Sequence, residues 1–182
     1  MATKEVSLIA ASCRNNGIGF KGTLPWRLKR EMAYFTKVTS EVRDDSKRNA
    51  VIMGRKTWQA IPSKYRPLAN RINVVLSKTI TQKPDGCDFL FADLQQALNS
   101  MLENEHVENI FIIGGEQIYR EAIANDLCRN IFLTRIDADY ECDAFFPQFD
   151  ENIYKQTQNT FVSADTDEEN GVKYKLCLYA RK

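Results

Sequence analysis

Glu31 is the residue whose surroundings in this sequence are least expected for a charge. It lies in LPWRLKREMAYF (24–35), where a Leu-Pro-Trp loop signal runs into a predicted helix. Residues three and four positions apart share a helical face, so Glu31 lies on the same face as Leu28 and Phe35. A buried carboxylate needs a partner, because burial without one is costly. Two interpretations are open: Glu31 reaches solvent or pairs with a neighbour such as Arg27, or its partner is a ligand.

Three predicted strands end in residues suited to binding an anion. MGRKTW (53–58) ends a strand in a glycine, two cations and a threonine that opens a short helix, predicted over 57–61. VVLSK (74–78) ends in a serine and a lysine, and IIGGEQIY (112–119) ends in two glycines that open another helix. Singly, each also fits an ordinary solvated strand end. Because parallel strands of an open α/β sheet end at one edge, the three together predict a nucleotide with several phosphates.

The stretch GIGFKG (17–22) matches the letters of a dinucleotide fingerprint but not its context. That fingerprint requires a strand that turns directly into a helix. Here residues 14–16 separate the strand from the glycines, Leu24-Pro25 follows at once, and Thr23 stands where a phosphate-binding loop needs lysine. Two interpretations stay open, a surface loop or a glycine-hinged lid.

Acidic residues alternate with apolar ones over 137–143. A calcium-binding loop needs Gly at its sixth position and Glu at its twelfth, and this segment has Cys142 and Gln148 there. We therefore predict a solvated face of a strand.

Composition excludes several classes of function. The 182 residues, 43% hydrophobic and 27% charged, predict one soluble globular domain over 1–182. A net charge of +1 gives no field for capturing nucleic acid or a membrane surface, and no apolar run approaches the ~20 residues that span a bilayer. The run after Lys4-Glu5 is too short for a signal peptide. Five scattered cysteines predict free thiols in a reducing compartment, and a single histidine, His106, excludes a His-rich metal site.

The elements that must position these residues follow from hydrophobic periodicity. Nearly continuous apolar runs predict buried parallel strands at 6–12, 49–54, 72–77, 88–92 and 109–115, with a further strand at 130–136. Stripes of apolar residues predict helices at 93–103, with Asp93 as N-cap, and at 115–124. The alternation in 173–182, after a turn signal in 165–171, predicts an antiparallel strand near an edge. The fold class is therefore α/β, with a mostly parallel sheet.

The motifs in this order resemble the dihydrofolate reductase family over the whole chain, most closely its animal form. The matching blocks are GIG..G.LPW (17–26), EMAYF (31–35), VIMGRKTW (51–58), IP...RPL..R (61–71), N.VLS (73–77), IIGG..IY (112–119), TRI (134–136), FFP (145–147) and G.KY (171–174). The resemblance implies a single domain with a central eight-stranded, mostly parallel mixed sheet, antiparallel C-terminal strands and helices on both faces. It also implies a monomeric cytoplasmic enzyme that reduces dihydrofolate with NADPH and binds antifolates.

The resemblance also implies roles for individual residues. Glu31 matches the acidic residue that binds the pterin ring, Thr134 the hydroxyl that supports it, and Arg71 the residue that binds the glutamate tail of the substrate. We expect burial to raise the pKa of Glu31, and we expect this carboxylate to be poorly satisfied by hydrogen bonds when no ligand is bound. The implied substrate-binding residues are Ile9, Ala10, Glu31, Met32, Phe35, Thr36, Ile61, Arg71 and Thr134.

The implied cofactor site draws on the three strand ends and the glycine-rich loop. Ser77 and Lys78 match the site for the ribose phosphate that distinguishes NADPH from NADH. The implied cofactor-binding residues are Ala11, Gly17, Ile18, Gly19, Phe20, Lys21, Gly22, Thr23, Arg55, Lys56, Thr57, Ser77, Lys78, Thr79, Gly114, Gly115, Glu116, Gln117, Ile118 and Tyr119. Cis peptide bonds are implied at Gly114-Gly115 and Arg66-Pro67. Ala92 departs from the family, whose animal members usually carry a cation there, so the preference for NADPH is open.

Two rival functions belong to other classes. One is an NADPH reductase of the same fold that acts on a riboflavin precursor, against which the combination of Glu31 and Arg71 argues. The other is a nucleotide-binding module without activity, which would need neither Glu31 nor a complete 17–23 loop.

Overall fold

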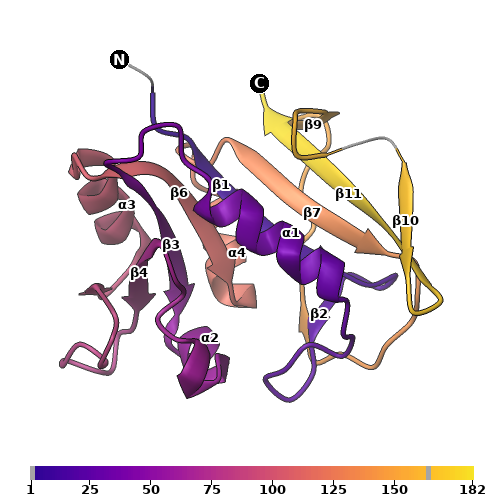
Figure 1. The fold of residues 1–182 in the computed structure, drawn as a ribbon, viewed down its shortest axis with the longest axis horizontal. Coiled ribbons are helices and arrows are strands. Elements are labelled where there is room, and N and C mark those ends of the chain that lie inside the picture. The colour runs from indigo at the N-terminus through magenta and orange to yellow at the C-terminus, as the bar shows by residue number, and fades with distance from the viewer. Residues whose placement is uncertain (1–2, 163–164) are drawn as a thin grey trace.

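The computed structural model describes residues 3–162 and 165–182, which form an α/β domain around one large twisted sheet (Figure 1). Its strands run in the order β10-β11-β7-β1-β6-β3-β4-β5. Their bounds are β1 Val6–Ser12, β3 Arg48–Gly54, β4 Arg71–Leu76, β5 Phe89–Phe91, β6 Val107–Gly114, β7 Asn130–Ile136, β10 Thr166–Glu169 and β11 Val172–Arg181. These eight strands confirm the predicted sheet. A short strand that was not predicted, β9 (Tyr154–Thr157), also pairs with β11.

The pairing confirms a mixed, mostly parallel sheet. Six adjacent strands are parallel to one another: β7, β1, β6, β3, β4 and β5. On the other side of β7, β11 runs antiparallel to it. The parallel strands therefore end at one edge, which is the lower edge in Figure 1. The predicted site residues that follow β1, β3, β4 and β6 are brought to this edge by the topology alone.

Helices cover both faces of the sheet, as expected. They are α1 Lys29–Ser40, α2 Arg55–Ala60, α3 Leu94–Glu103 and α4 Glu116–Ile123, with a 3₁₀ turn at Ser63–Tyr65. Successive strand residues point to opposite faces, so Leu8 packs in a cluster with Leu98 of α3, while Ile9 packs in a second cluster with Val38 of α1 and Trp58 of α2. Both clusters are almost fully shielded from solvent, which explains the continuous apolar character of the strands.

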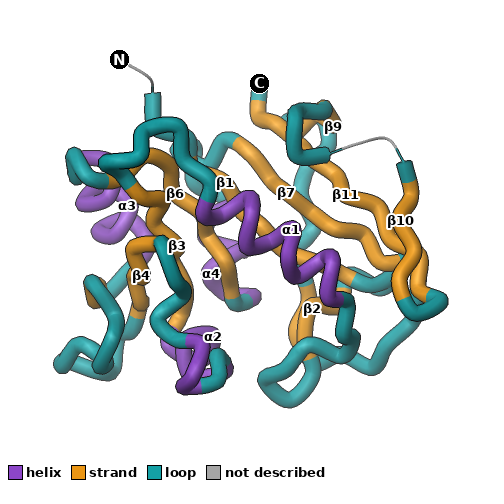
Figure 2. Tube along the Cα trace, viewed as in Figure 1, coloured by secondary structure: helices purple, strands orange, loops and turns teal. Residues whose placement is uncertain are grey.

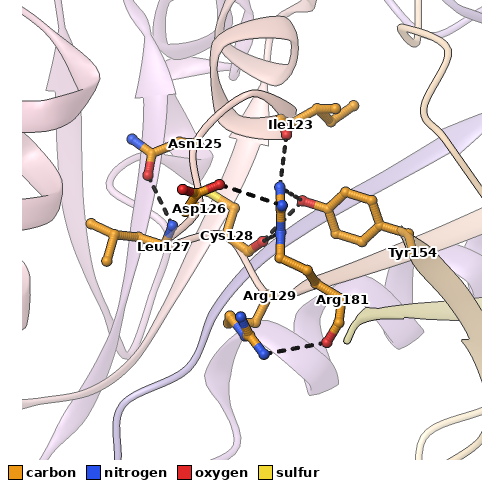
Figure 3. Close-up of polar contacts among 8 residues, drawn as sticks. All are labelled: Ile123, Asn125, Asp126, Leu127, Cys128, Arg129, Tyr154 and Arg181. Carbon is orange, nitrogen blue, oxygen red and sulfur yellow. Dashed lines mark hydrogen bonds and ion pairs between the residues drawn. The ribbon is translucent and has the colours of Figure 1, made fainter. Parts of the chain in front are cut away.

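The last strand is fixed by the side chain of Arg181. Its guanidinium donates to the carbonyls of Ile123 and Cys128 and to the hydroxyl of Tyr154, at 3.0, 3.3 and 3.0 Å respectively (Figure 3). It also lies 3.5 Å from the Asp126 carboxylate. These contacts join the end of β11 to the connection between α4 and β7. They therefore attach the antiparallel strand β11 to the part of the chain that leads into the parallel strand β7.

Besides the unpredicted short strands, local structure departs from the predictions at three places. Residues 166–169, predicted within a turn over 165–171, form β10, and the turn lies at Asn170-Gly171. Residues 137–143 form no strand, and Arg14 pairs with the exposed side chains of Asp137 and Asp139 at 2.8 and 3.0 Å. Helix α2 begins at Arg55 rather than at residue 57, directly where β3 ends. Asp93 does cap α3, accepting from Gln96 N at 2.9 Å.

The five cysteines are all free thiols, as predicted. Of the helices in 3–162 and 165–182, none has the length and apolar character that crossing a bilayer requires.

Candidate active site

The carboxylate of Glu31 lies in a buried position on the first turn of α1. The residue is 7% exposed, and its Oε1 accepts a hydrogen bond from Thr134 Oγ1 at 2.9 Å. The parallel pairing of β1 with β7 places Thr134 beside Ala11, at the edge where the strands end. Salt bridges in the described part of the chain do not involve Glu31. The interpretation that this residue reaches solvent or pairs with Arg27 is therefore wrong.

Burial raises the pKa of Glu31, and the hydrogen bond from Thr134 lowers it by a smaller amount. The bond from Thr134 is the one that the resemblance implies, and among the hydrogen bonds of the described residues it is the only one that this carboxylate accepts, so Glu31 is poorly satisfied, as expected. The side chain thus combines an apolar setting with a single neutral donor. Such a group binds a ligand that offers hydrogen-bond donors or positive charge.

Apolar residues that flank Glu31 on α1 belong to two buried clusters. Leu28 is 5% exposed. Phe35 and Ile61 pack in the same cluster as Ile9 of β1.

Within the described residues, two buried polar atoms have no hydrogen-bond partner, the indole Nε1 of Trp26 and the hydroxyl of Tyr34. Neither residue was among the predicted site residues, and only the sequence LPW next to Glu31 pointed toward Trp26.

Two predicted contacts on α1 lie on its exposed side. Met32 is 48% exposed and Thr36 is also exposed, whereas Glu31 and Val38 are buried. These side chains therefore border solvent near the site and do not form its floor.

Arg71 is buried at the start of β4 and does not have the solvated position that is ordinary for a strand-start cation. The residue is 6% exposed. Its Nε donates to the Ala69 carbonyl and its Nη1 to the Thr39 hydroxyl, both at 2.9 Å. Burial lowers its pKa. The two hydrogen bonds hold the guanidinium in a fixed orientation. Among the described residues no carboxylate forms a salt bridge with Arg71, so its charge is uncompensated.

The three strand ends meet at one edge. Met53 of β3 pairs with Gly114 of β6, and Gly54 pairs with Leu76 of β4, the residue before Ser77. A Cβ added to Gly115 would lie 3.4 Å from the Thr57 hydroxyl, so the starts of α2 and α4 face one another closely. The peptide bonds Gly114-Gly115 and Arg66-Pro67 are both cis, as predicted.

The residues after β4 form a tight turn. Ser77 Oγ accepts from the backbone N–H groups of Thr79 and Ile80, each at 3.2 Å, and Lys78 is exposed. Ser77 N donates to Phe91 O of β5 at 3.0 Å, which places Ala92 close by in the chain. The lysine is therefore free to contact an anion at this corner.

Helix α4 contacts both β1 and β8. Tyr119 is buried and its hydroxyl donates to the Ile9 carbonyl at 2.7 Å. Glu116 accepts from the backbone N–H of Phe145 at 2.8 Å and pairs with Arg120 at 3.0 Å. The negative charge of Glu116 is thus compensated within the protein.

The 17–23 loop is held by a segment that the sequence did not associate with it. β2 (Gly17–Gly19) pairs with β8 (Ala144–Phe145), and the connection from β2 to α1 is a long loop (Figure 2). Asp143 N donates to Gly19 O at 2.9 Å, and Asp143 Oδ2 accepts from Lys21 N at 3.0 Å. A side chain at position 17 would lie 2.2 Å from Cys142 Sγ, so that position requires glycine. The acidic segment therefore anchors the loop.

A separate cleft of about 670 Å³ lies between the ends of β1 and β7 and the β10–β11 hairpin, and its lining includes Arg14 and Arg135. Its lining includes none of the predicted site residues.

Comparisons with known proteins agree on one family. The family model described as dihydrofolate reductase matches residues 5–181. The dihydrofolate reductase of Aedes albopictus is 40% identical, with 98% of both chains covered, and that of Gallus gallus is 40% identical, with 98% of this chain and 97% of the relative covered. The solved structure of Schistosoma mansoni dihydrofolate reductase superposes with a TM-score of 0.84 at 35% identity, covering 100% of each chain.

Proposed function

The chain belongs to the dihydrofolate reductase family, and we propose that it reduces 7,8-dihydrofolate to 5,6,7,8-tetrahydrofolate with hydride from NADPH. The observation that carries the proposal is the buried Glu31 carboxylate, supported by Thr134 and set among apolar side chains where the parallel strands end. A nucleotide-binding module has no use for such a group. The reaction adds hydride to C6 of the pterin and a proton to N5.

Glu31 orients the pterin in this mechanism. A carboxylate that accepts two hydrogen bonds, from a ring N–H and from the exocyclic amine, fixes the ring plane and polarises it. Glu31 is 7% exposed, and the low exposure to water strengthens these bonds. Glu31 binds the side of the ring away from N5, so we assign delivery of the proton to a water under the 17–23 loop.

Arg71 binds the glutamate tail. Its guanidinium is fixed by Ala69 and Thr39, neither of which bonds to Nη2. A preoriented, uncompensated guanidinium matches a carboxylate in shape and charge. Glu31 lies on α1, and Arg71 lies at the start of β4. This arrangement suits a ligand whose polar ring binds Glu31 and whose anionic end binds Arg71.

The strand-end residues fit NADPH, which supplies the hydride when bound. The close approach of Gly115 to the Thr57 hydroxyl brings the starts of α2 and α4 together, and the N–H groups of helix starts suit a diphosphate. Arg55, Lys56 and Lys78 add positive charge along the same edge. Lys78, with Ser77, would hold the ribose phosphate. The missing cation at Ala92 is expected to reduce, and not to abolish, the preference for NADPH over NADH.

A direct assay tests the proposal. Purified protein with NADPH should lose absorbance of the reduced nicotinamide when dihydrofolate is added, and an antifolate should abolish the loss. Glu31→Gln should remove most of this activity at neutral pH but spare it at acid pH, where the substrate arrives already protonated. Full activity of Glu31→Gln at neutral pH would contradict the assigned role.

The same assay separates the rival functions. Oxidation of NADPH by a riboflavin precursor, with no response to dihydrofolate, would instead support the related reductase. Binding of NADPH without turnover of either compound would support the module. We also expect a monomer in the cytoplasm, and these two points stay predictions.

A further inference from the structure

The first turn of α1 has no cap from its own sequence. The N-cap residue is Leu28, whose side chain cannot accept a hydrogen bond, and the first N–H groups of a helix need acceptors. The acceptor comes from the C-terminal hairpin instead. Glu169 of β10 accepts from Lys29 N through Oε2 at 2.6 Å and from Arg30 N through Oε1 at 3.0 Å. Figure 1 shows the start of α1 beside the turn between β10 and β11.

The hairpin is built to hold that carboxylate in place. β10 pairs with β11 so that Glu169 lies opposite Val172, and the side chain of Glu169 is only 12% exposed. Asn170 and Gly171 between them have φ values of 54° and 78°, the positive angles of a tight hairpin turn. The Arg30 guanidinium also donates to the backbone carbonyl of Glu168, which adds a second connection between helix and hairpin.

We infer that Glu169 is a positioning residue for the reaction: it fixes the first turn of α1, and with it the placement of Glu31 against Thr134, and it sets a second negative charge near that carboxylate. Glu31 follows Arg30 directly, so any fraying of this turn moves the substrate-binding group. The inference rests on the proposed function in one respect, that Glu31 binds the substrate.

The charges around Glu31 make Glu169 distinctive. The ionisable groups that interact with Glu31 are Tyr34 on its own helix, Tyr119 of α4, Tyr174 of β11 and Glu169 of β10. Burial raises the pKa of all three tyrosines, so they are neutral at physiological pH. Burial is also the main cause of the raised pKa of Glu31, and the charge of Glu169 raises it further. The charge of Glu169 itself faces the exposed Arg30 guanidinium, whose Nε lies 4.0 Å from Oε1, and Asp167 also lies near Tyr174. Glu169 therefore contributes both a geometric and an electrostatic effect.

The electrostatic part can be tested without any enzymatic assay. Glutamate carboxyl carbons are labelled with ¹³C, and the Glu31 resonance is identified as the one lost in Glu31→Gln. In Glu169→Gln, which removes the charge but keeps one carbonyl acceptor for the helix, the titration midpoint of Glu31 should move to lower pH. Glu168→Gln is the matched control, because it removes the same charge from the same hairpin at an exposed side chain, and its midpoint should equal that of the wild type. Equal midpoints in Glu169→Gln and Glu168→Gln would overturn the inference.

The geometric part is tested by kinetics at pH 7. Loss of an N-cap weakens a helix start by about 1 kcal/mol, so Glu169→Ala should lower kcat for dihydrofolate about five-fold. The KM for NADPH should not change, since that site lies on other elements. Glu169→Asp should recover part of the loss, and Glu168→Ala should match the wild type. Wild-type kcat in Glu169→Ala would refute the positioning role. If the wild type itself fails to reduce dihydrofolate, the proposed function fails, while the carboxyl titration still decides whether Glu169 controls Glu31.

Discussion

Replacement of Thr134 by valine probes the hydrogen bond to Glu31 most directly. The substitution keeps the shape of the side chain and removes the donor that lies 2.9 Å from Glu31 Oε1. Hydrogen bonds to charged groups contribute about 1.5–3 kcal/mol, and the bond joins two residues that are 1% and 7% exposed, so water replaces it poorly. We expect Thr134→Val to lower the free energy of unfolding at neutral pH by this amount. For a chain of 182 residues this corresponds to a fall in Tm of roughly 3–12 °C.

The pH dependence of this loss follows from linkage. The pKa of Glu31 in the folded protein is raised above its ordinary value of 4.5, so stability falls as the pH rises from that value through the folded-state pKa. Removing the Thr134 donor raises the folded-state pKa further, because that bond favours the ionised form. The difference in stability between Thr134→Val and the wild type should therefore grow with pH across this window and be smaller in acid.

Urea denaturation from pH 4.5 to pH 8 measures this difference. The variants required are Thr134→Val, Glu31→Met, which removes the acceptor at a similar volume, and the double replacement, with Thr134→Ser as the control that keeps the hydroxyl. The double-mutant cycle should give a coupling of about 1.5–3 kcal/mol at pH 8. A coupling below about 0.5 kcal/mol, or a loss in Thr134→Val that is the same at every pH, would refute the reasoning.

Three further predictions concern the remaining site residues. Glu31→Gln should be more stable than the wild type at pH 8 but not at pH 4.5, because it removes a buried charge only where Glu31 is ionised; equal stability at pH 8 by urea denaturation would count against this. Arg71→Leu should raise the KM for dihydrofolate at least ten-fold, as loss of a buried charged bond predicts, yet leave reduction of a pteridine without the glutamate tail nearly unchanged; a similar rise for both substrates would make Arg71 purely structural. Lys78→Ala should weaken NADPH about ten-fold more than NADH in fluorescence titrations, and equal weakening of both cofactors would exclude a ribose phosphate site at this lysine.

Much of the fold follows from local patterns in the sequence. The apolar runs predicted β1, β3, β4, β6 and β7 to within two residues, because strands covered on both faces can carry no polar alternation. The short elements β2, β8 and β9 were missed, since two to four residues carry no periodicity. The run of acids at 137–143 was misassigned as a strand because its alternation is real, but its partner, Arg14, is distant in the chain.

The sequence by itself determined which residues could do chemistry and at which edge of the sheet. Because parallel strands end at the same edge of a sheet, the sequence predicts that Thr57, Ser77 and Gly115 lie at one edge, and the strand pairing confirms this. The environment of Glu31 was not determined in this way. Helical periodicity shows which face a residue shares, but it does not show what covers that face.

The family resemblance implied Thr134 as a partner of Glu31, but no local pattern did, and the physical cause of this environment lies in the tertiary structure. Thr134 reaches Glu31 only because β7 pairs with β1, and Glu169 reaches the start of α1 only because the C-terminal hairpin folds back across more than a hundred residues. Burial, pKa and hydrogen bonding depend on all neighbours in space, and most of those neighbours are remote in sequence. The carboxylate that the sequence marked as unusual is therefore given its function by contacts that no local pattern encodes.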